Sequence, residues 1–202
     1  EVLADQRPDR LILFRGPGTA IVENGPPLEL LGPGTSAAVC ITAGGSGSLD
    51  ASLQPMARNM AARDLAEFLG KISGETVEVE RDGRVNDNVK TLFRIGVDDP
   101  VRLFPELATG DEQGFGIAVQ QAAGHREVVF ASRSAMGHVY AVWFFLYNFC
   151  GVRILGMGDL MEVIPPPGPI LVPSDLRALV PGPAFQMRSN CGLEGAVQHR
   201  WL

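Results

Sequence analysis

The segment from residue 132 to 155, SRSAMGHVYAVWFFLYNFCGVRIL, most constrains what this chain can fold into. Apolar residues occupy nearly every side of a helix expected over residues 134–149, and Gly151 follows its end. A helix that is apolar nearly all round must be buried on more than one side. Its longest apolar run, residues 139–147, falls far short of the ~20 residues that cross a bilayer. The segment therefore predicts a core helix that packs against a sheet and against a second body.

Several extended segments supply a sheet for this helix. Residues 91–97 and 114–120 alternate apolar and other side chains, as a half-buried strand does, and residues 37–42 form a short apolar run. Residues 76–80 and 127–132 are further predicted strands. A second helix is expected from about residue 53 to 72, with one apolar face, and Gly74 ends it. The predicted class is α+β, a mainly antiparallel or mixed sheet with two principal helices packed on one face.

Proline and glycine divide the chain into three parts. Residues 1–36 are rich in turns, with short strands between them. Residues 37–164 hold the predicted strands and helices. Residues 165–202 begin with the proline-rich stretch PPPGPILVP, which is typical of a connector at a domain edge. We expect an α/β sandwich in the middle part, and an exit followed by the truncated start of another domain in the last.

Charge and composition exclude several function classes. The net charge is -6 and no basic cluster occurs, so we expect no nucleic-acid partner. The three cysteines include no CxxC pair, and the histidines are isolated in sequence, so we expect neither a metal site nor a cofactor. At 46% hydrophobic residues the chain has an ordinary globular composition.

No stretch carries a complete catalytic motif. His138 lies on the helix expected over residues 134–149 and could be a general base, but no acid or nucleophile accompanies it. Ser132 and Ser134 lack the G-x-S-x-G context of a nucleophile elbow. The acidic pairs at 98–99 and 111–112 are expected to be solvated. The sequence therefore predicts no catalytic residue, and the chain alone is not expected to be an enzyme.

A glycine-rich loop, AGGSGS, follows the predicted strand at residues 37–42. Backbone N–H groups at the start of a helix can bind phosphate, so Gly44–Ser48 is a candidate phosphate or nucleotide site. The loop matches neither GxxxxGK[ST] nor GxGxxG. Phosphate or nucleotide binding is therefore kept as an alternative function.

The succession of motifs resembles a known domain. MARNMAARDLAEFLGKISGETVEV is similar to a helix-and-strand segment of the domain that precedes the catalytic barrel in several glycoside hydrolases. LFRIGV, GFGIAV and VVFASRSAMGHVYAVWFFLYNFCGVRIL resemble its later strands, its G-x-x-YA helix and its GVR strand. These hydrolases include the family 67 α-glucuronidases and the family 20 β-hexosaminidases. The resemblance covers about residues 37–190, although Met136 stands where that pattern usually has arginine.

The resemblance implies a non-catalytic accessory domain that supports a C-terminal (β/α)₈ barrel, absent from this chain. It implies structural roles for six landmarks: Gly74, Gly137, Tyr140, Ala141, Gly151 and Arg153. PAFQMRSN resembles the first barrel strand of these enzymes, and Arg188 matches an arginine that holds sugar hydroxyls there. Arg188 would serve only with the missing barrel.

Three functions follow from these patterns. The first is an accessory domain of a larger, secreted or periplasmic glycoside-hydrolase-like protein in glycan degradation, with its own barrel as partner. The second is a free-standing carbohydrate- or protein-binding module that uses the apolar face a barrel would cover. The third is the phosphate- or nucleotide-binding domain that uses Gly44–Ser48.

Overall fold

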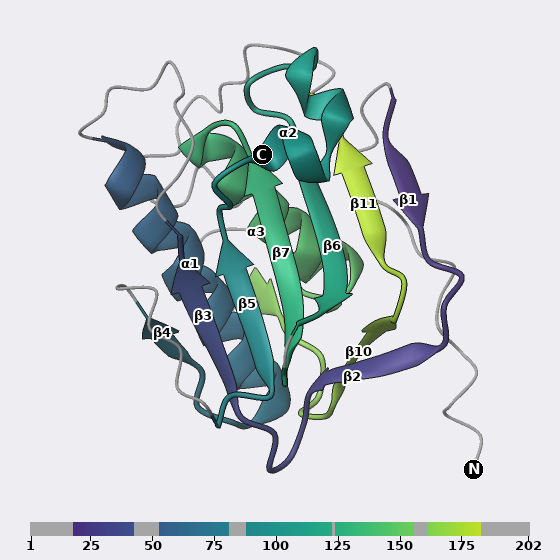
Figure 1. Cartoon of the computed structure of the whole chain (residues 1–202). Helices are drawn as coiled ribbons and strands as arrows, with labels where there is room; N and C mark the ends of the chain where they lie inside the picture. Colours follow the sequence, from purple (N-terminus) through teal and green to yellow (C-terminus); the bar gives the residue numbers. More distant parts are fainter. Residues whose placement is uncertain (1–17, 43–52, 81–87, 123, 156–160, 183–202) are drawn as a thin grey trace.

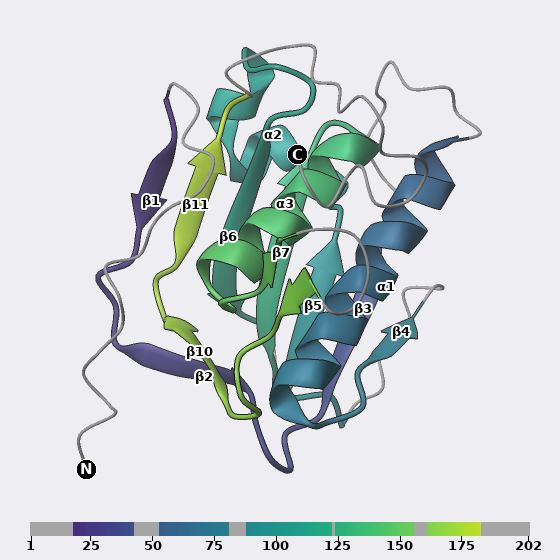
Figure 2. The same cartoon turned by 180° about the vertical axis from the view of Figure 1, so that it is seen from behind.

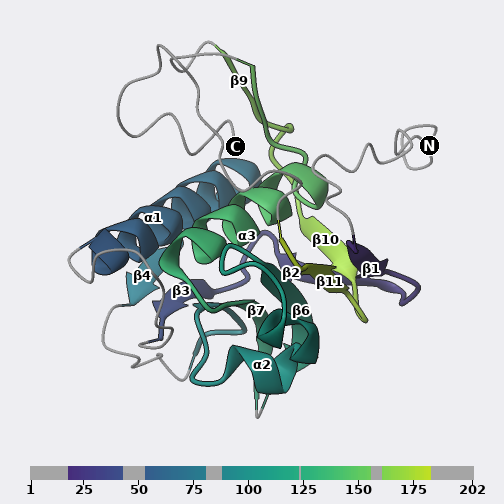
Figure 3. The ribbon, with the colours of Figure 1, turned by 90° about the horizontal axis from the view of Figure 1, so that it is seen from above.

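A seven-stranded mixed sheet forms the centre of the molecule (Figure 1). The computed structural model describes residues 18–42, 53–80, 88–122, 124–155 and 161–182. Two long helices cover one face of the sheet, side by side (Figure 2). A short helix and a 3-10 turn lie on the opposite face (Figure 3). The predicted α+β class, with two principal helices on one face, is confirmed.

The sheet combines a parallel half and an antiparallel half. Its strands lie in the order β1 (Ala20–Val22), β11 (Arg177–Val180), β6 (Phe115–Gln121), β7 (Arg126–Ser132), β5 (Thr91–Ile95), β3 (Ala37–Ile41) and β4 (Glu78–Glu80). The pairings of β4 with β3, β3 with β5, and β5 with β7 are parallel. The pairings of β7 with β6, β6 with β11, and β11 with β1 are antiparallel. The sheet is therefore mixed.

The two long helices are α1 (Leu53–Ser73) and α3 (Ala135–Asn148). Helix α1 ends at Gly74, whose φ of 76° is a conformation that glycine adopts readily. Helix α3 begins at Ser134, whose side chain accepts a hydrogen bond from the backbone N–H of Gly137 at 3.0 Å. This is a regular N-cap. The short elements α2 (Pro100–Leu103) and η1 (Pro105–Ala108) follow β5.

Contacts inside this chain account for the apolar circumference of α3. Phe145 packs edge-on against Phe130 of β7, with ring centroids 5.5 Å apart. Trp143 packs against Phe68 of α1 at 5.3 Å. Edge-to-face aromatic pairs each contribute about 1 kcal/mol beyond their buried area. The second body that the sequence predicted beside this helix is α1, so α3 does not require another domain to cover it.

Two small antiparallel sheets complete the described structure. One pairs β2 (Pro27–Leu31) with β10 (Ile170–Pro173), and the other pairs β8 (Arg153–Ile154) with β9 (Glu162–Val163). The proline-rich stretch that was expected to be only a connector therefore contributes β10, and β11 follows it into the large sheet. Proline is tolerated there because β10 has a single strand neighbour, which leaves one edge without ladder bonds.

Candidate functional site

The carboxyl ends of β3 and β5 meet at one edge of the parallel half of the sheet. The chain leaves β3 toward α1 on one face, and leaves β5 toward α2 on the other (Figure 3). Adjacent parallel strands whose connections go to opposite faces leave a crevice at their carboxyl ends, and ligands of open α/β sheets bind there. This edge is therefore the first place to look for a site.

Gly96 follows β5 directly and shapes this edge. Its φ is 88°, and its N–H donates to the carbonyl of Phe130 at 2.9 Å. A Cβ at this position would lie 2.9 Å from the carbonyl oxygen of Thr42, which is tighter than real contacts allow. The same Cβ would lie 3.7 Å from Cε1 and Nε2 of His138. Glycine here lets the backbone and the imidazole approach each other closely.

His138 lies in the first turns of α3 and is fully buried. Within the described residues, neither of its ring nitrogens has a hydrogen-bond partner. Burial, followed by the positive charge of Arg58, lowers the pKa of His138 to about 3. The imidazole is therefore neutral at physiological pH. A neutral imidazole carries one N–H donor and one acceptor nitrogen, and both are left without a partner here.

Positive groups lie near His138. Helices α1 and α3 both begin near this edge, and neither has an acidic residue in its first turn. Helix N-termini carry partial positive charge that acidic residues commonly balance. Arg58 of α1 adds a partly buried guanidinium, whose pKa burial lowers. We name this set of residues, Arg58, Gly96 and His138, the strand-end corner.

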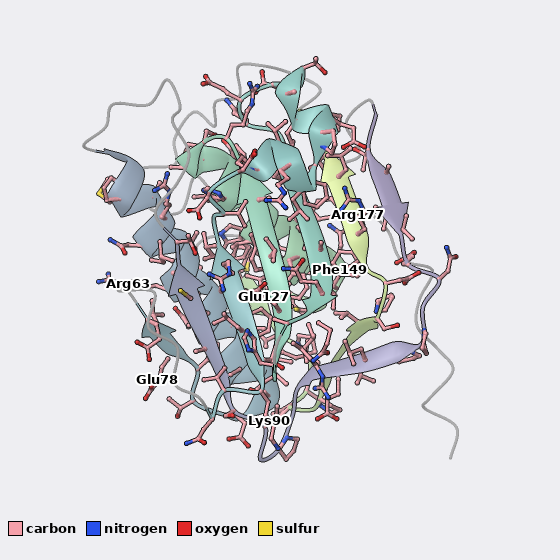
Figure 4. All side chains as sticks on the ribbon, viewed as in Figure 1. Arg63, Glu78, Lys90, Glu127, Phe149 and Arg177 are labelled. Carbon is pink, nitrogen blue, oxygen red and sulfur yellow. The ribbon has the colours of Figure 1, made fainter. Side chains whose placement is uncertain are left out.

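A second polar cluster lies on the opposite face of the sheet, where Figure 4 labels Glu127. The carboxylate of Glu127 accepts from Nε of Arg94 at 2.6 Å and from Nε2 of Gln120 at 2.5 Å. Nη1 of Arg94 also donates to Oγ1 of Thr42 at 3.2 Å. Each member of this cluster has partners across neighbouring strands, as a cross-strand structural pair does. It therefore offers less reason to expect a ligand than the strand-end corner.

Two other polar residues considered from the sequence, Asp99 and Ser132, have local structural partners. Asp99 caps α2 by accepting from the N–H of Arg102 at 3.0 Å. Oγ of Ser132 donates to the carbonyl of Gly114 at 2.7 Å. His125 lies in the turn between β6 and β7, on a different element from His138, and Nε2 of its ring has no hydrogen-bond partner within the described residues. The structure therefore does not join these residues into a catalytic arrangement.

The landmark residues named by the resemblance lie around α3. A Cβ on Gly137 would lie only 2.0 Å from Oγ of Ser132, so the helix can approach the end of β7 only with glycine there. Ala141 is fully buried and Tyr140 packs against the core. Gly151 has a φ of 76° just after the helix.

Arg153, in β8, donates from Nη1 to the backbone carbonyls of Tyr147 and Val152. These bonds tie the end of α3 to the strand that follows. Gly44–Ser48, Arg188 and His199 lie outside the described residues.

The sequence patterns did not identify Arg58 and Gly96 as candidate site residues. Arg58 lies among other charged residues of an amphipathic helix, so nothing in its neighbourhood separates it from a solvated arginine. Gly96 gives a weak signal, because a glycine after an apolar strand often marks a close backbone approach. Only the pairing of β3, β5 and β7 brings these residues together with His138.

The described residues contain neither a candidate metal cluster nor a candidate membrane span. No group of three or more histidine, cysteine, aspartate or glutamate side chains among them could hold a metal ion. None of their helices is both long and apolar enough to cross a membrane.

Comparison with known proteins finds likeness only among solved structures. No family profile and no curated sequence matches the chain. The family 20 β-N-acetylhexosaminidase of Streptomyces coelicolor A3(2) is similar with a TM-score of 0.47 and 14% identity, over 83% of this chain and 26% of that one. The Streptomyces plicatus N-acetyl-β-hexosaminidase gives 0.44 and 17%, over 83% and 25%. The family 20 exo-β-N-acetylglucosaminidase of Vibrio harveyi gives 0.37 and 14%, over 83% and 18%. The chain spans about a quarter or less of the length of these proteins.

Proposed function

We propose that this chain is a non-catalytic accessory domain of a larger glycoside-hydrolase-like protein that degrades glycans outside the cytoplasm. A (β/α)₈ barrel would follow it and carry the paired carboxylates of glycosidic hydrolysis. Arg188 would belong to the first strand of that barrel and hold sugar hydroxyls.

The observation that carries this proposal is the position of the residues on which the resemblance rests. Gly137 and Gly151 stand where α3 meets its neighbours, and Arg153 ties the helix end to β8. These residues determine how closely α3 packs against its neighbouring elements, and they do not converge on one another as catalytic groups would. Such an arrangement suits a supporting domain.

An exposed apolar hairpin gives further support. Leu155 and Val163 expose 61% and 48% of their surface, and both belong to the β8–β9 hairpin, which extends away from the sheet (Figure 3). Lys71 of α1 anchors this hairpin through Glu162 at 3.1 Å. Exposed apolar side chains on an anchored projection are a suitable contact for an adjoining domain.

The intact mass of the native gene product tests the proposal first. We expect a product larger than this 21.6 kDa chain by about the 250 residues of a barrel. We then expect the native product to release p-nitrophenol from a p-nitrophenyl N-acetyl-β-glucosaminide or α-glucuronide, and this chain alone to release none. A native product with the mass of this chain would refute the proposal and favour a free-standing binding module. Hydrolysis by the chain alone would refute it as well.

A further inference from the structure

We infer that Asn24 is a site of spontaneous deamidation, and that the carboxylate of Asp175 restrains the reaction while the fold around it is intact. Asn24 and Gly25 form the one Asn-Gly pair of the sequence. Glycine has no side chain to hinder attack by its backbone nitrogen, and its backbone turns freely, so this pair is a favoured context for deamidation. The inference is independent of the accessory-domain proposal, because it involves no other domain.

The reaction needs only this pair of residues and water. The backbone nitrogen of Gly25 loses its proton and attacks Cγ of Asn24, so that a new N–Cγ bond forms. The Cγ–Nδ2 bond breaks, and the nitrogen leaves as ammonia with the proton that Gly25 lost. Water then opens the succinimide at either of its carbonyls, which gives aspartate or isoaspartate. Each product places a new negative charge at position 24.

Asn24 lies where solvent can reach it. It belongs to the connection between β1, which ends at Val22, and β2, which begins at Pro27, and it is exposed. Exposure alone would let it react as it does in an unfolded chain. Any restraint on the reaction must therefore come from the contacts of its backbone.

The carboxylate of Asp175 holds both backbone nitrogens of the pair. Its Oδ1 accepts from the N–H of Gly25 at 2.6 Å, and its Oδ2 accepts from the N–H of Asn24 at 3.2 Å. Asp175 lies between β10 and β11, so these bonds join that connection to the one between β1 and β2 (Figure 1). We call Asn24, Gly25 and Asp175 the Asp175 clamp.

The clamp acts on the nitrogen that would attack. A hydrogen bond from the N–H and a nearby negative charge both disfavour removal of its proton. The nitrogen of Gly25 also cannot turn toward Cγ of Asn24 without losing a charge-assisted hydrogen bond. Loss of a hydrogen bond to a charged group changes an equilibrium by about tenfold or more, so we expect a restraint of that size.

Packing explains why the reactive pair occurs here. A Cβ at position 25 would lie 2.6 Å from Oγ of Ser174 and 2.7 Å from Oδ1 of Asp175. No larger residue fits there unless the turn that holds Ser174 and Asp175 moves. The close approach that requires glycine therefore also brings the carboxylate that protects Asn24.

Deamidation should loosen β1. A carboxylate at position 24 would stand beside that of Asp175 and repel it, and isoaspartate would also displace the N–H of Gly25. Strand β1 has three residues and pairs with β11 alone, so it depends on the contacts at its end. Its release would leave the edge of β11 open to pairing with other chains.

The test is the rate of conversion of Asn24, followed by peptide mass spectrometry while the chain is kept in mildly alkaline buffer. We expect the denatured chain to react about tenfold faster than the folded chain, or more. Asp175→Ala should bring the folded chain close to the denatured rate. Asp175→Asn, which keeps an acceptor oxygen without the charge, should give an intermediate rate. Asn88 is exposed but precedes a branched valine, so it is the slow internal reference in every sample.

Two control variants separate the clamp from general effects. Asp98→Ala removes an exposed aspartate that follows β5 and should leave the rate unchanged. Trp143→Phe lowers the overall stability from the contact between α1 and α3, and should also leave the rate unchanged while circular dichroism shows a folded chain. Equal rates in the folded and the denatured unaltered chain would overturn the inference. So would a rate in Asp175→Ala that is unchanged or slower, or an equal gain from Trp143→Phe.

Asn24→Asp tests the effect on β1, because it supplies the product's charge directly. Amide hydrogen exchange should become faster in β1 and β11 and stay the same in β5. Unchanged exchange in β1, in both this variant and the deamidated chain, would overturn the release of the strand.

Discussion

Replacing His138 with leucine should remove one acid-sensitive step from the stability of this protein. The folded state holds the imidazole neutral, with a pKa of about 3, whereas an unfolded histidine has a pKa near 6.5. Above pH 6.5 both states are neutral and the group adds no pH dependence. As the pH falls below 6.5 the unfolded chain takes up a proton that the folded chain refuses, and stability is lost until about pH 3.

The size of this loss of stability follows from the pH interval between the folded and the unfolded pKa of His138. Each pH unit between the two pKa values removes between about 1 and 2 kcal/mol from the free energy of unfolding. From pH 6.5 to pH 4 the unaltered chain should therefore lose about 3 kcal/mol relative to His138→Leu. At pH 7 the variant should be equal in stability or slightly more stable, because leucine removes two polar atoms without partners.

Urea unfolding of both proteins at pH 7, 6, 5 and 4, in phosphate-free buffer and followed by circular dichroism, measures this difference. Carboxylates also titrate in this range, but their contribution is common to both proteins and cancels in the subtraction. His125→Leu is the control, because His125 is only half-buried in a turn. A free-energy difference between His138→Leu and the unaltered chain that stays constant within about 0.5 kcal/mol from pH 7 to pH 4 would refute the reasoning.

Three further changes test the packing around α3 and the sheet, each by urea unfolding. Gly137→Ala should lower the free energy of unfolding by about 3 kcal/mol, because the added methyl group meets a side-chain oxygen. The control is Gly168→Ala, whose Cβ would lie 3.9 Å from the nearest atom and which should change stability by less than about 0.5 kcal/mol. Similar losses from the two variants would contradict the steric explanation. Trp143→Phe should cost about 2 kcal/mol, because Nε1 donates to the buried carboxylate of Asp64 at 3.2 Å, and a neutral result would mean that this bond adds nothing. Glu127→Gln should lower the free energy of unfolding by about 2 kcal/mol. This loss is smaller than for a fully buried ion pair because the partner, Arg94, is 30% exposed, and added salt should reduce it further.

The sequence predicted the fold well where periodicity and length are distinctive. The apolar run of α3, the one-sided stripe of α1 and the alternating strand β6 are each repeated often enough to identify their type. Gly74 and Gly151, at the helix ends, likewise have the positive φ that such positions favour. These signals are local, so a single sequence displays them.

The remaining structure depends on pairings that no local pattern encodes. Strand β10 is four residues long, follows Pro169 and ends at Pro173. Its composition is therefore that of a linker, and only its pairing with β2 makes it a strand. Whether a sheet is parallel or antiparallel depends on which strands meet, and alternation is the same in both. The strand-end corner is hidden for the same reason. Arg58, Gly96 and His138 are distant in sequence, and only the order of the parallel strands places them together.

The pairing of β1 with β11 determines how late during its synthesis this protein can complete its large sheet. Ala20 stands opposite Leu179, so β1 has to wait for 179 − 20 = 159 further residues before its partner exists. At the usual 5–20 residues per second the ribosome needs roughly 10 to 30 seconds to make them. Once β6 is complete at Gln121, the edge that β11 will cover stays unpaired on the nascent chain until Arg177–Val180 has been made. An exposed strand edge is a template for pairing with other chains. The last described strand is therefore the one that protects the sheet from aggregation, and a chain that stops before it should accumulate in an insoluble form.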